Sequence, residues 1–385
     1  MVTELPGTYR YDASWNSECY YGTMRLAVCE NQLYVCGRGT QHFFVERYNP
    51  STVSWTALST QSFMTDAGDW AKRMYYSTIR LIAIQDKIYV FARGTINIHF
   101  STYSLSTNSW TIEYFFWLGD SGGWGNAQYY ETIRLTELDG QLFVIARGAH
   151  VLHIGEFNPT TTKWMFPPSP PAWMGDAQGF DQPEYYSTIR IQAFAHRIYI
   201  FTRTPLGAQI AYYIPAEQRL VLTPPVSLFI EGDGWELPKC YKTIRAEAHE
   251  GKWYICGKGI RSLLLVCFDT QSNDWRVLPT TNVLLTLTAD AAFCYETFRM
   301  ALVSDKLVIF ARGNNSSIFL NFNLRTREWE EPPTRTDKLS AEKYNEPSYY
   351  STVMTATVGD RLYVCMRGEQ QLQMVSYDSP QRSNS

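Results

Sequence analysis

The chain has 385 residues, of which 45% are hydrophobic, and its formal net charge is -3. No basic stretch stands out, so the composition disfavours binding to nucleic acid or to an anionic membrane surface. No segment reaches the roughly 18 consecutive apolar residues of a membrane helix, and the first residues lack the charged start and apolar run of a secretion signal. We therefore expect a cytoplasmic protein without membrane insertion, with release by a non-classical route left open.

A six-residue phrase recurs along the whole chain and defines its organisation. The copy at Tyr129 reads YYETIR, and related copies recur at intervals of 54 to 56 residues. The seven copies begin at Tyr20, Tyr75, Tyr129, Tyr185, Cys240, Cys294 and Tyr349. A period of this size indicates one supersecondary unit that is repeated seven times.

Each repeat predicts four antiparallel strands. In the second repeat, residues rich in β-branched side chains fill 78–84 and 88–94, with a turn between them. A third strand is expected over 98–104, and a fourth begins at Trp110 after a turn-forming stretch. Four such strands make one blade of a β-propeller.

The blades predict an all-β, seven-bladed β-propeller. Because no linker interrupts the repeats, we expect a single domain over 1–378, followed by a disordered tail over 379–385. Most second strands end in Arg-Gly, as in Arg147-Gly148, and a turn followed by Trp recurs, as in FNPTTTKW at Trp164. This half of the unit resembles a kelch repeat, in which paired glycines stand where this chain has Arg-Gly.

The two ends of the chain predict how the last blade is completed. The seventh repeat stops after a third strand over 372–377 and lacks a Trp-led fourth strand. Val2 to Pro6 precedes the first copy of the phrase by about the distance at which fourth strands precede later copies. We predict that this N-terminal strand completes the last blade, which would remove an open sheet edge.

Between each fourth strand and the next copy lies a loop that is longer than a hairpin needs. Its better preserved versions combine an acidic residue, glycine and an aromatic residue, as in Asp120-Ser121-Gly122-Gly123-Trp124. An aromatic ring can cover the apolar face of a sugar, and Asp and Arg can bind its hydroxyl groups. The candidate ligand-binding residues are therefore the loop pairs and the Arg of the following phrase: Asp66, Trp70 and Arg80; Asp120, Trp124 and Arg134; Asp176, Phe180 and Arg190; and Asp233, Trp235 and Arg245.

The run from Gly119 through Gly123-Trp124 and Arg134 to Arg147-Gly148 resembles the repeat of the seven-bladed lectins typified by the Psathyrella velutina lectin. The resemblance covers the whole chain and implies binding of N-acetylglucosamine or sialic acid in equivalent pockets between blades. That family holds calcium in an Asp-rich turn between its first two strands. Here the turn reads Gln85-Asp86-Lys87, which has too few carboxylates for a hard cation, so calcium is expected to be absent.

The same residues also have a purely structural explanation. The Tyr pairs and the turn Trp residues would pack one blade on the next, while each Arg would cap buried carbonyl groups or pair with a loop Asp. For the loop aromatics Trp15, Trp70, Trp124 and Trp235, the structural and the binding explanations stay open.

Known catalytic and metal-binding motifs are missing from the sequence: there is no GxSxG, no phosphate loop and no HExxH. His150 and His153 would lie on opposite faces of a strand, which does not suit one metal ion. The eight cysteines include no CxxC, so we interpret them as buried hydrophobes in a reducing compartment. We expect no metal and no cofactor.

The last three repeats depart from the pattern and leave a second function open. Apolar runs fill 226–230 and 283–285, and Met354 replaces the Arg of the phrase. An apolar opening of this kind would suit a small apolar molecule. A weaker resemblance is therefore to the fungal hetero-Diels-Alderases, which are lectin-like propellers without metals. The sequence thus predicts glycans as partners, with a cofactor-independent cyclase or pericyclase of fungal secondary metabolism as the alternative.

Overall fold

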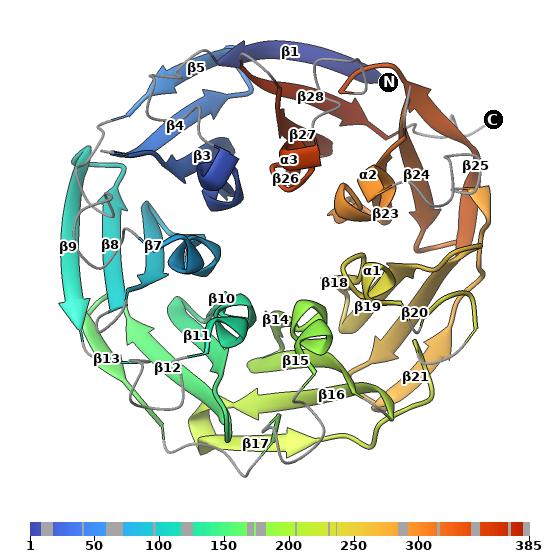
Figure 1. The fold of residues 1–385 in the computed structure, drawn as a ribbon, viewed down its shortest axis with the longest axis horizontal. Helices are drawn as coiled ribbons and strands as arrows, with labels where there is room; N and C mark the ends of the chain where they lie inside the picture. Colours follow the sequence, from blue (N-terminus) through green and yellow to red (C-terminus); the bar gives the residue numbers. More distant parts are fainter. Residues whose placement is uncertain are drawn as a thin grey trace. The chain divides into compact units, whose positions relative to one another are not determined.

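The computed structural model describes residues 1–8, 18–40, 42–58, 72–94, 98–115, 117, 126–167, 173–174, 182–204, 206–229, 232–235, 237–283, 292–313, 316–339, 347–368 and 371–379. Each of the seven repeats forms one four-stranded antiparallel sheet, as Figure 1 shows. The chain is therefore an all-β, seven-bladed β-propeller, as the repeat predicted. By contacts it divides into two compact units, which are described separately below.

The first unit comprises Met1–Cys36, Val45–Ala57 and Lys242–Ser385. It begins with β1 (Val2–Thr8), the 3-10 helix η2 (Glu18–Thr23) and most of the first sheet. That sheet is β2 (Arg25–Cys29), β3 (Gln32–Arg38), β4 (Phe43–Asn49) and β5 (Ser54–Ala57).

The same unit contains the last three sheets. The fifth is β18 (Arg245–His249), β19 (Lys252–Lys258), β20 (Leu263–Asp269) and β21 (Asp274–Val277). The sixth follows α2 (Ala292–Glu296) and is β22 (Arg299–Val303), β23 (Lys306–Arg312), β24 (Ser317–Asn323) and β25 (Glu328–Thr336). The seventh follows α3 (Pro347–Tyr350) and is β26 (Met354–Val358), β27 (Arg361–Arg367), β28 (Leu372–Asp378) and β1.

The second unit comprises Gly37–Phe44 and Leu58–Tyr241 and holds the second, third and fourth sheets. They are β6 (Arg80–Ile84), β7 (Lys87–Arg93), β8 (Ile98–Ser104) and β9 (Ser109–Phe115); β10 (Arg134–Leu138), β11 (Gln141–Arg147), β12 (Leu152–Asn158) and β13 (Lys163–Met165); and β14 (Arg190–Phe194), β15 (Arg197–Thr204), β16 (Gly207–Ile214) and β17 (Arg219–Leu222). The helices of this unit are η4 (Arg73–Thr78), η6 (Ala127–Thr132), η8 (Pro183–Thr188), η9 (Pro215–Glu217) and α1 (Pro238–Tyr241).

Strand β1 completes the seventh sheet, which confirms the predicted N-terminal closure. It pairs antiparallel with β28, from Val2 opposite Tyr377 to Thr8 opposite Leu372, and forms the outer edge of that sheet in Figure 1. The terminal ammonium group of Met1 donates to the carbonyl oxygen of Asp378 at 2.8 Å. An edge that would otherwise expose unpaired N–H and C=O groups is thereby satisfied.

The turn before each fourth strand explains the recurring turn-and-Trp motif. In the third sheet, the Asn158 carboxamide oxygen accepts the N–H groups of Thr160 and Thr161 at 2.9 and 3.0 Å. Trp164 then packs against Phe157 of the neighbouring strand, with ring centroids 5.2 Å apart. Such side-chain capping of a turn favours the hairpin locally. These Trp residues therefore have the packing role expected of them.

Second strands are buried on both faces and carry the core of each blade. In β11, every residue from Leu142 to Arg147 is buried. A run of Leu, Phe, Val, Ile and Ala suits a strand with apolar neighbours on both faces. In the described parts of the chain, no helix is long and apolar enough to cross a membrane.

Candidate functional site

The first two residues of each phrase, Tyr-Tyr or Cys-Tyr, lie on a short helix, not at the start of a strand. In the second sheet we predicted a strand from Thr78, but Arg73–Thr78 forms η4 and the strand begins at Arg80. Tyr75 and Tyr76 on this helix are buried. A single 3-10 turn has no periodic apolar pattern, so sequence alone gave no signal for it.

The Thr of the phrase fastens this helix to the second strand. The Thr132 hydroxyl donates to the carbonyl of Tyr129 at 2.6 Å and accepts the backbone N–H of Arg147 at 2.9 Å. The same N–H to hydroxyl bond recurs in other blades between the strand end and the Thr of the phrase: Arg93 to Thr78, Arg203 to Thr188, Lys258 to Thr243, Arg312 to Thr297 and Arg367 to Thr352. Every copy of the phrase has Thr at this position, which is the signal that sequence reasoning missed.

The cation at the end of each second strand is buried beneath these helices. The seven cations are at most 5% exposed: Arg38, Arg93, Arg147, Arg203, Lys258, Arg312 and Arg367. Arg147 lies 4.9 and 4.4 Å from the ring centroids of Tyr129 and Tyr186, which belong to successive blades. Lys258 lies 4.2 Å from the ring of Tyr295. A desolvated cation–π contact is worth about 2 kcal/mol, so this layer stabilises blade packing.

Two of these cations also anchor the loops that lead to the next blade. Arg147 Nε donates to the carbonyl of Met174 at 2.5 Å, and Arg203 Nε donates to the carbonyl of Phe229 at 3.0 Å. Met174 and Phe229 have φ values of 61° and 56°, in a region that bulky residues rarely adopt. Sequence reasoning missed both anchors, because nothing in an apolar residue signals a left-handed backbone.

The Arg residues of the phrase, which we proposed as ligand-binding residues, make backbone hydrogen bonds. Arg80 donates from Nη1 to the carbonyls of Ser77 and Ile79 at 2.5 and 2.8 Å, and from Nε to Ile133 of the next blade at 2.7 Å. Arg134, Arg190 and Arg245 bond equivalent carbonyls in their own blades. The carbonyl-capping explanation therefore describes what these side chains do, and ligand binding by them stays a prediction.

Burial also affects the same Arg position in the sixth blade. Desolvation lowers the pKa of Arg299 to about 10, which still leaves the guanidinium protonated at neutral pH. It donates to Val353 of the next blade at 2.8 Å. In the seventh blade Met354 stands at this position and has no such donors.

Most of the predicted loop residues lie outside the described residues: Asp66, Trp70, Asp120, Trp124, Asp176 and Phe180. Asp233 and Trp235 are described, in a turn where Gly232, Asp233 and Gly234 all have positive φ. The Trp235 ring is 4% exposed and packs edge-on against Phe229, with centroids 4.9 Å apart. A ring so buried has no free face for a sugar, so in this conformation Trp235 acts in packing.

The apolar run of the fifth loop, residues 226–230, is fixed to the fourth blade where it is described. Val226 pairs with Ala208 through two backbone hydrogen bonds, and Phe229 is 2% exposed. Phe229 packs against Phe201 at 6.1 Å as well as against Trp235. Phe229 is therefore part of the core of the fourth blade, which corrects the expected apolar opening at this residue, whereas Val226 and Leu228 stay partly exposed.

The titratable groups of the described residues give no candidate metal centre. No cluster of three or more His, Cys, Asp or Glu that could hold a metal ion is found among them. The eight cysteines are free, and burial raises the pKa of the Cys36 and Cys365 thiols to about 12. Desolvation on the inner strand β18 raises the pKa of Glu247 to about 8.

Comparisons with known proteins place the chain by fold only. No protein-family model and no curated protein matches it. Among solved structures, it is similar to a protein from Lactobacillus plantarum, with a TM-score of 0.53, 11% identity, and 80% of this chain and 83% of that chain covered. It also matches polysaccharide lyase Uly1, with a TM-score of 0.49, 14% identity, and 91% and 88% covered. The β-propeller domain of Nup133 from Vanderwaltozyma polyspora matches with a TM-score of 0.48, 9% identity, and 98% and 97% covered.

Proposed function

We propose that the protein is a lectin that binds glycans in several similar pockets, formed by the loops that precede the short helices of its blades. The observation that carries the proposal is that the same structure recurs next to each of these loops. The helix, its Thr bond and the buried cation recur from blade to blade with nearly the same distances. Loops that share an acidic residue, glycine and an aromatic would therefore start from equivalent positions.

Several weak, equivalent sites suit a lectin, because multivalent glycans bind to them with increased avidity. The repeated loop chemistry supplies an aromatic ring for the sugar face and a carboxylate for its hydroxyl groups. The loop residues expected to contact sugar are Asp66, Trp70, Asp120, Trp124, Asp176 and Phe180.

A glycan array followed by calorimetry on the purified chain tests the proposal. We expect binding to N-acetylated or sialylated glycans, with weak affinity for a single sugar and stronger retention on clustered glycans. The absence of binding to N-acetylated, fucosylated and sialylated glycans at millimolar ligand would overturn the lectin assignment.

One observation favours a second candidate, a cofactor-independent cyclase. The fifth to seventh blades lose the symmetry of the others, with Lys258 in place of Arg and Met354 in place of the phrase Arg. An enzyme concentrates function in one sector, whereas equivalent lectin pockets share it. Loss of all activity from a change in one loop would therefore favour the cyclase.

A further inference from the structure

A cleft between the fifth and sixth blades opens at the end of the sheets opposite to the short helices. It is bordered by the turns between first and second strands, at Glu250 and Asp305, and by the turn that contains Leu324 and Arg327. Its outer part has a volume of about 380 Å³, within the usual range for small-molecule sites. A smaller inner hollow of about 20 Å³ adjoins it, shares Lys252, Tyr254, Leu324 and Arg327 with it, and adds Arg276, Leu278 and Phe322 to the lining. All of its lining residues belong to the first unit. We call it the basic cleft.

The floor of the basic cleft is apolar. Tyr254 and Phe322 are buried and belong to one hydrophobic cluster, against which Leu278 and Leu324 pack with part of their surface exposed. Burial raises the pKa of Tyr254 to about 12, so its hydroxyl keeps its proton at neutral pH. This hydroxyl is hydrogen-bonded to the Cys267 side chain, so the floor offers an apolar surface to a ligand.

Three cations surround this floor: Lys252, Arg276 and Arg327. Among the described residues, none forms a hydrogen bond or an ion pair within 4 Å with the head groups of these three side chains. Arg276 and Arg327 are exposed, and Lys252 is half-buried. Lys252 and Arg276 act on Asp269 through their charge without a direct contact, so the N–H donors of all three cations are available to a ligand.

Two of the three carboxylates of the cleft, in contrast, already have close partners. Asp305 pairs with Arg325 at 2.7 Å, and Asp269 accepts the backbone N–H groups of Gln271 and Ser272 at 3.0 and 3.4 Å. Those two N–H groups lower the pKa of Asp269, so it stays ionised as the cap of its turn. Glu250 lies 3.8 Å from His249 on the exposed rim. The lining has four cations, Lys252, Arg276, Arg325 and Arg327, against the three carboxylates of Glu250, Asp269 and Asp305, so the net charge of the cleft is positive.

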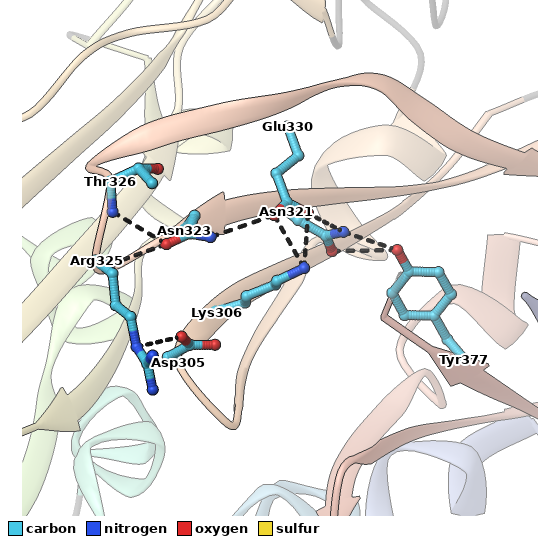
Figure 2. Close-up of polar contacts among 8 residues, drawn as sticks. All are labelled: Asp305, Lys306, Asn321, Asn323, Arg325, Thr326, Glu330 and Tyr377. Atoms are coloured by element: carbon cyan, nitrogen blue, oxygen red, sulfur yellow. Dashed lines mark hydrogen bonds and ion pairs between the residues drawn. The ribbon is translucent and has the colours of Figure 1, made fainter. Parts of the chain in front are cut away.

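Hydrogen bonds hold the wall that comes from the sixth blade, as Figure 2 shows. Asn323 accepts the backbone N–H groups of Arg325 and Thr326 at 3.0 and 3.1 Å. Behind this turn, Lys306 pairs with Glu330 at 2.9 Å, and Asn321 bonds the Tyr377 hydroxyl at 2.9 Å. A wall fixed before binding loses little conformational entropy when a ligand arrives.

We infer that the basic cleft binds a small organic acid, a carboxylate or phosphate carried on an aromatic or aliphatic body. The apolar body would lie on Tyr254, Leu278 and Leu324, and the acid group would face Lys252, Arg276 and Arg327. Charge-assisted hydrogen bonds to such cations are the strong ones, and the apolar floor excludes water from one side of them. This site is separate from the glycan loops and does not depend on them.

Phenyl phosphate and benzoate are the probes that test this inference, with inorganic phosphate and benzyl alcohol as partial ligands. Calorimetric titration of the full chain should give saturable binding of at least one of the two aromatic acids. Inorganic phosphate and benzyl alcohol should each bind about tenfold more weakly, because phosphate lacks the apolar body and benzyl alcohol lacks the acid group. Equal binding of inorganic phosphate and phenyl phosphate would contradict a role for the apolar floor.

Variants locate the site. Lys252→Gln combined with Arg327→Gln should weaken binding of the aromatic acid by at least about tenfold, since it removes two charged donors. Arg219→Gln on β17, a change of the same kind at a residue that does not line the cleft, should leave the affinity unchanged, and so should Trp124→Ala in a glycan loop. Matching melting temperatures establish that the variants are folded. No saturable binding at millimolar probe, or unchanged binding in the double variant, would overturn the inference.

Discussion

Arg147 illustrates how a charged residue can occupy the core of a blade. Its guanidinium is fully buried, yet it donates to the Met174 carbonyl and to the Tyr186 hydroxyl and lies over two Tyr rings. A buried charge is tolerated when hydrogen bonds and ring faces replace its lost hydration. The recurring Arg-Gly is thus a packing device that joins blades and anchors a loop.

Replacement of Arg147 by Met should destabilise the chain by about 2 to 5 kcal/mol, because the cation–π contact is lost and the Met174 carbonyl is left without its donor. Urea unfolding measures this change. The matched control is Arg219→Met, because the Arg219 side chain is 58% exposed and pairs with Glu217. A loss at Arg147 no larger than that at Arg219 would show that the buried layer contributes little.

The Thr of the repeated phrase should also contribute to stability. Thr132→Val keeps the shape of the side chain but leaves the buried N–H of Arg147 without an acceptor, so we expect a cost of about 1 to 3 kcal/mol. Thr161→Val, in an exposed turn, should cost almost nothing. Equal unfolding midpoints for the two variants would remove the role that we assign to this hydroxyl.

Glu247 predicts a pH dependence. The pKa of Glu247 in the folded chain is about 8, above its ordinary value of 4.5. Between pH 4.5 and pH 8, the folded chain therefore keeps a proton on this carboxyl that the unfolded chain has lost. The contribution of the neutral carboxyl to the free energy of unfolding is therefore fully present below pH 4.5. It is lost progressively as the pH rises from 4.5 towards 8. Glu247→Gln stays neutral, so its melting temperature relative to the wild type should rise by a few degrees between pH 5 and pH 8.

The control for Glu247 is Glu328→Gln, an exposed residue at the start of β25. Its difference in melting temperature from the wild type should stay flat over the same range. A Glu247→Gln curve that runs parallel to the wild-type curve would mean that the carboxyl is already ionised in the folded chain.

At the scale of elements, β1 completes the seventh sheet, as its position in the sequence allowed us to predict. Besides pairing with β28, it accepts a hydrogen bond from Trp55 Nε1 to the Pro6 carbonyl at 2.7 Å. Deletion of Met1 to Pro6 should lower the melting temperature by several degrees, because it exposes the edge of β28. Deletion of residues 381–385 is the control, and an unchanged melting curve after the first deletion would contradict this closure.

Strands that repeat a local pattern of residues could be predicted from the sequence, whereas features made by contacts between distant residues could not. The strands Ile98–Ser104 and Lys87–Arg93 follow from β-branched runs and turns. The short helix that holds Tyr75 and Tyr76 has no such pattern. The burial of Trp235 depends on Phe229, and the basic cleft joins turns about fifty residues apart, so neither leaves a local signal.

At the scale of the whole molecule, seven sheets of the same design carry loops whose chemistry is partly shared and partly lost. The first four blades keep the Arg-bearing phrase with Tyr-Tyr, whereas the fifth and sixth have Cys-Tyr and the seventh has Met354 in place of Arg. If the loops bind glycans, the preserved blades should carry most of the sites. The account therefore predicts more than one site and fewer than seven.

The most direct test of this account is the number of monosaccharide sites per chain, measured by calorimetry with N-acetylglucosamine or sialic acid. The wild type should show several sites of similar affinity, and Trp70→Ala and Trp124→Ala should each remove about one site while leaving the affinity of the others unchanged. Trp235→Ala should instead reduce stability, since its ring is buried. A single site per chain, abolished by one loop change and untouched by the other, would contradict the account.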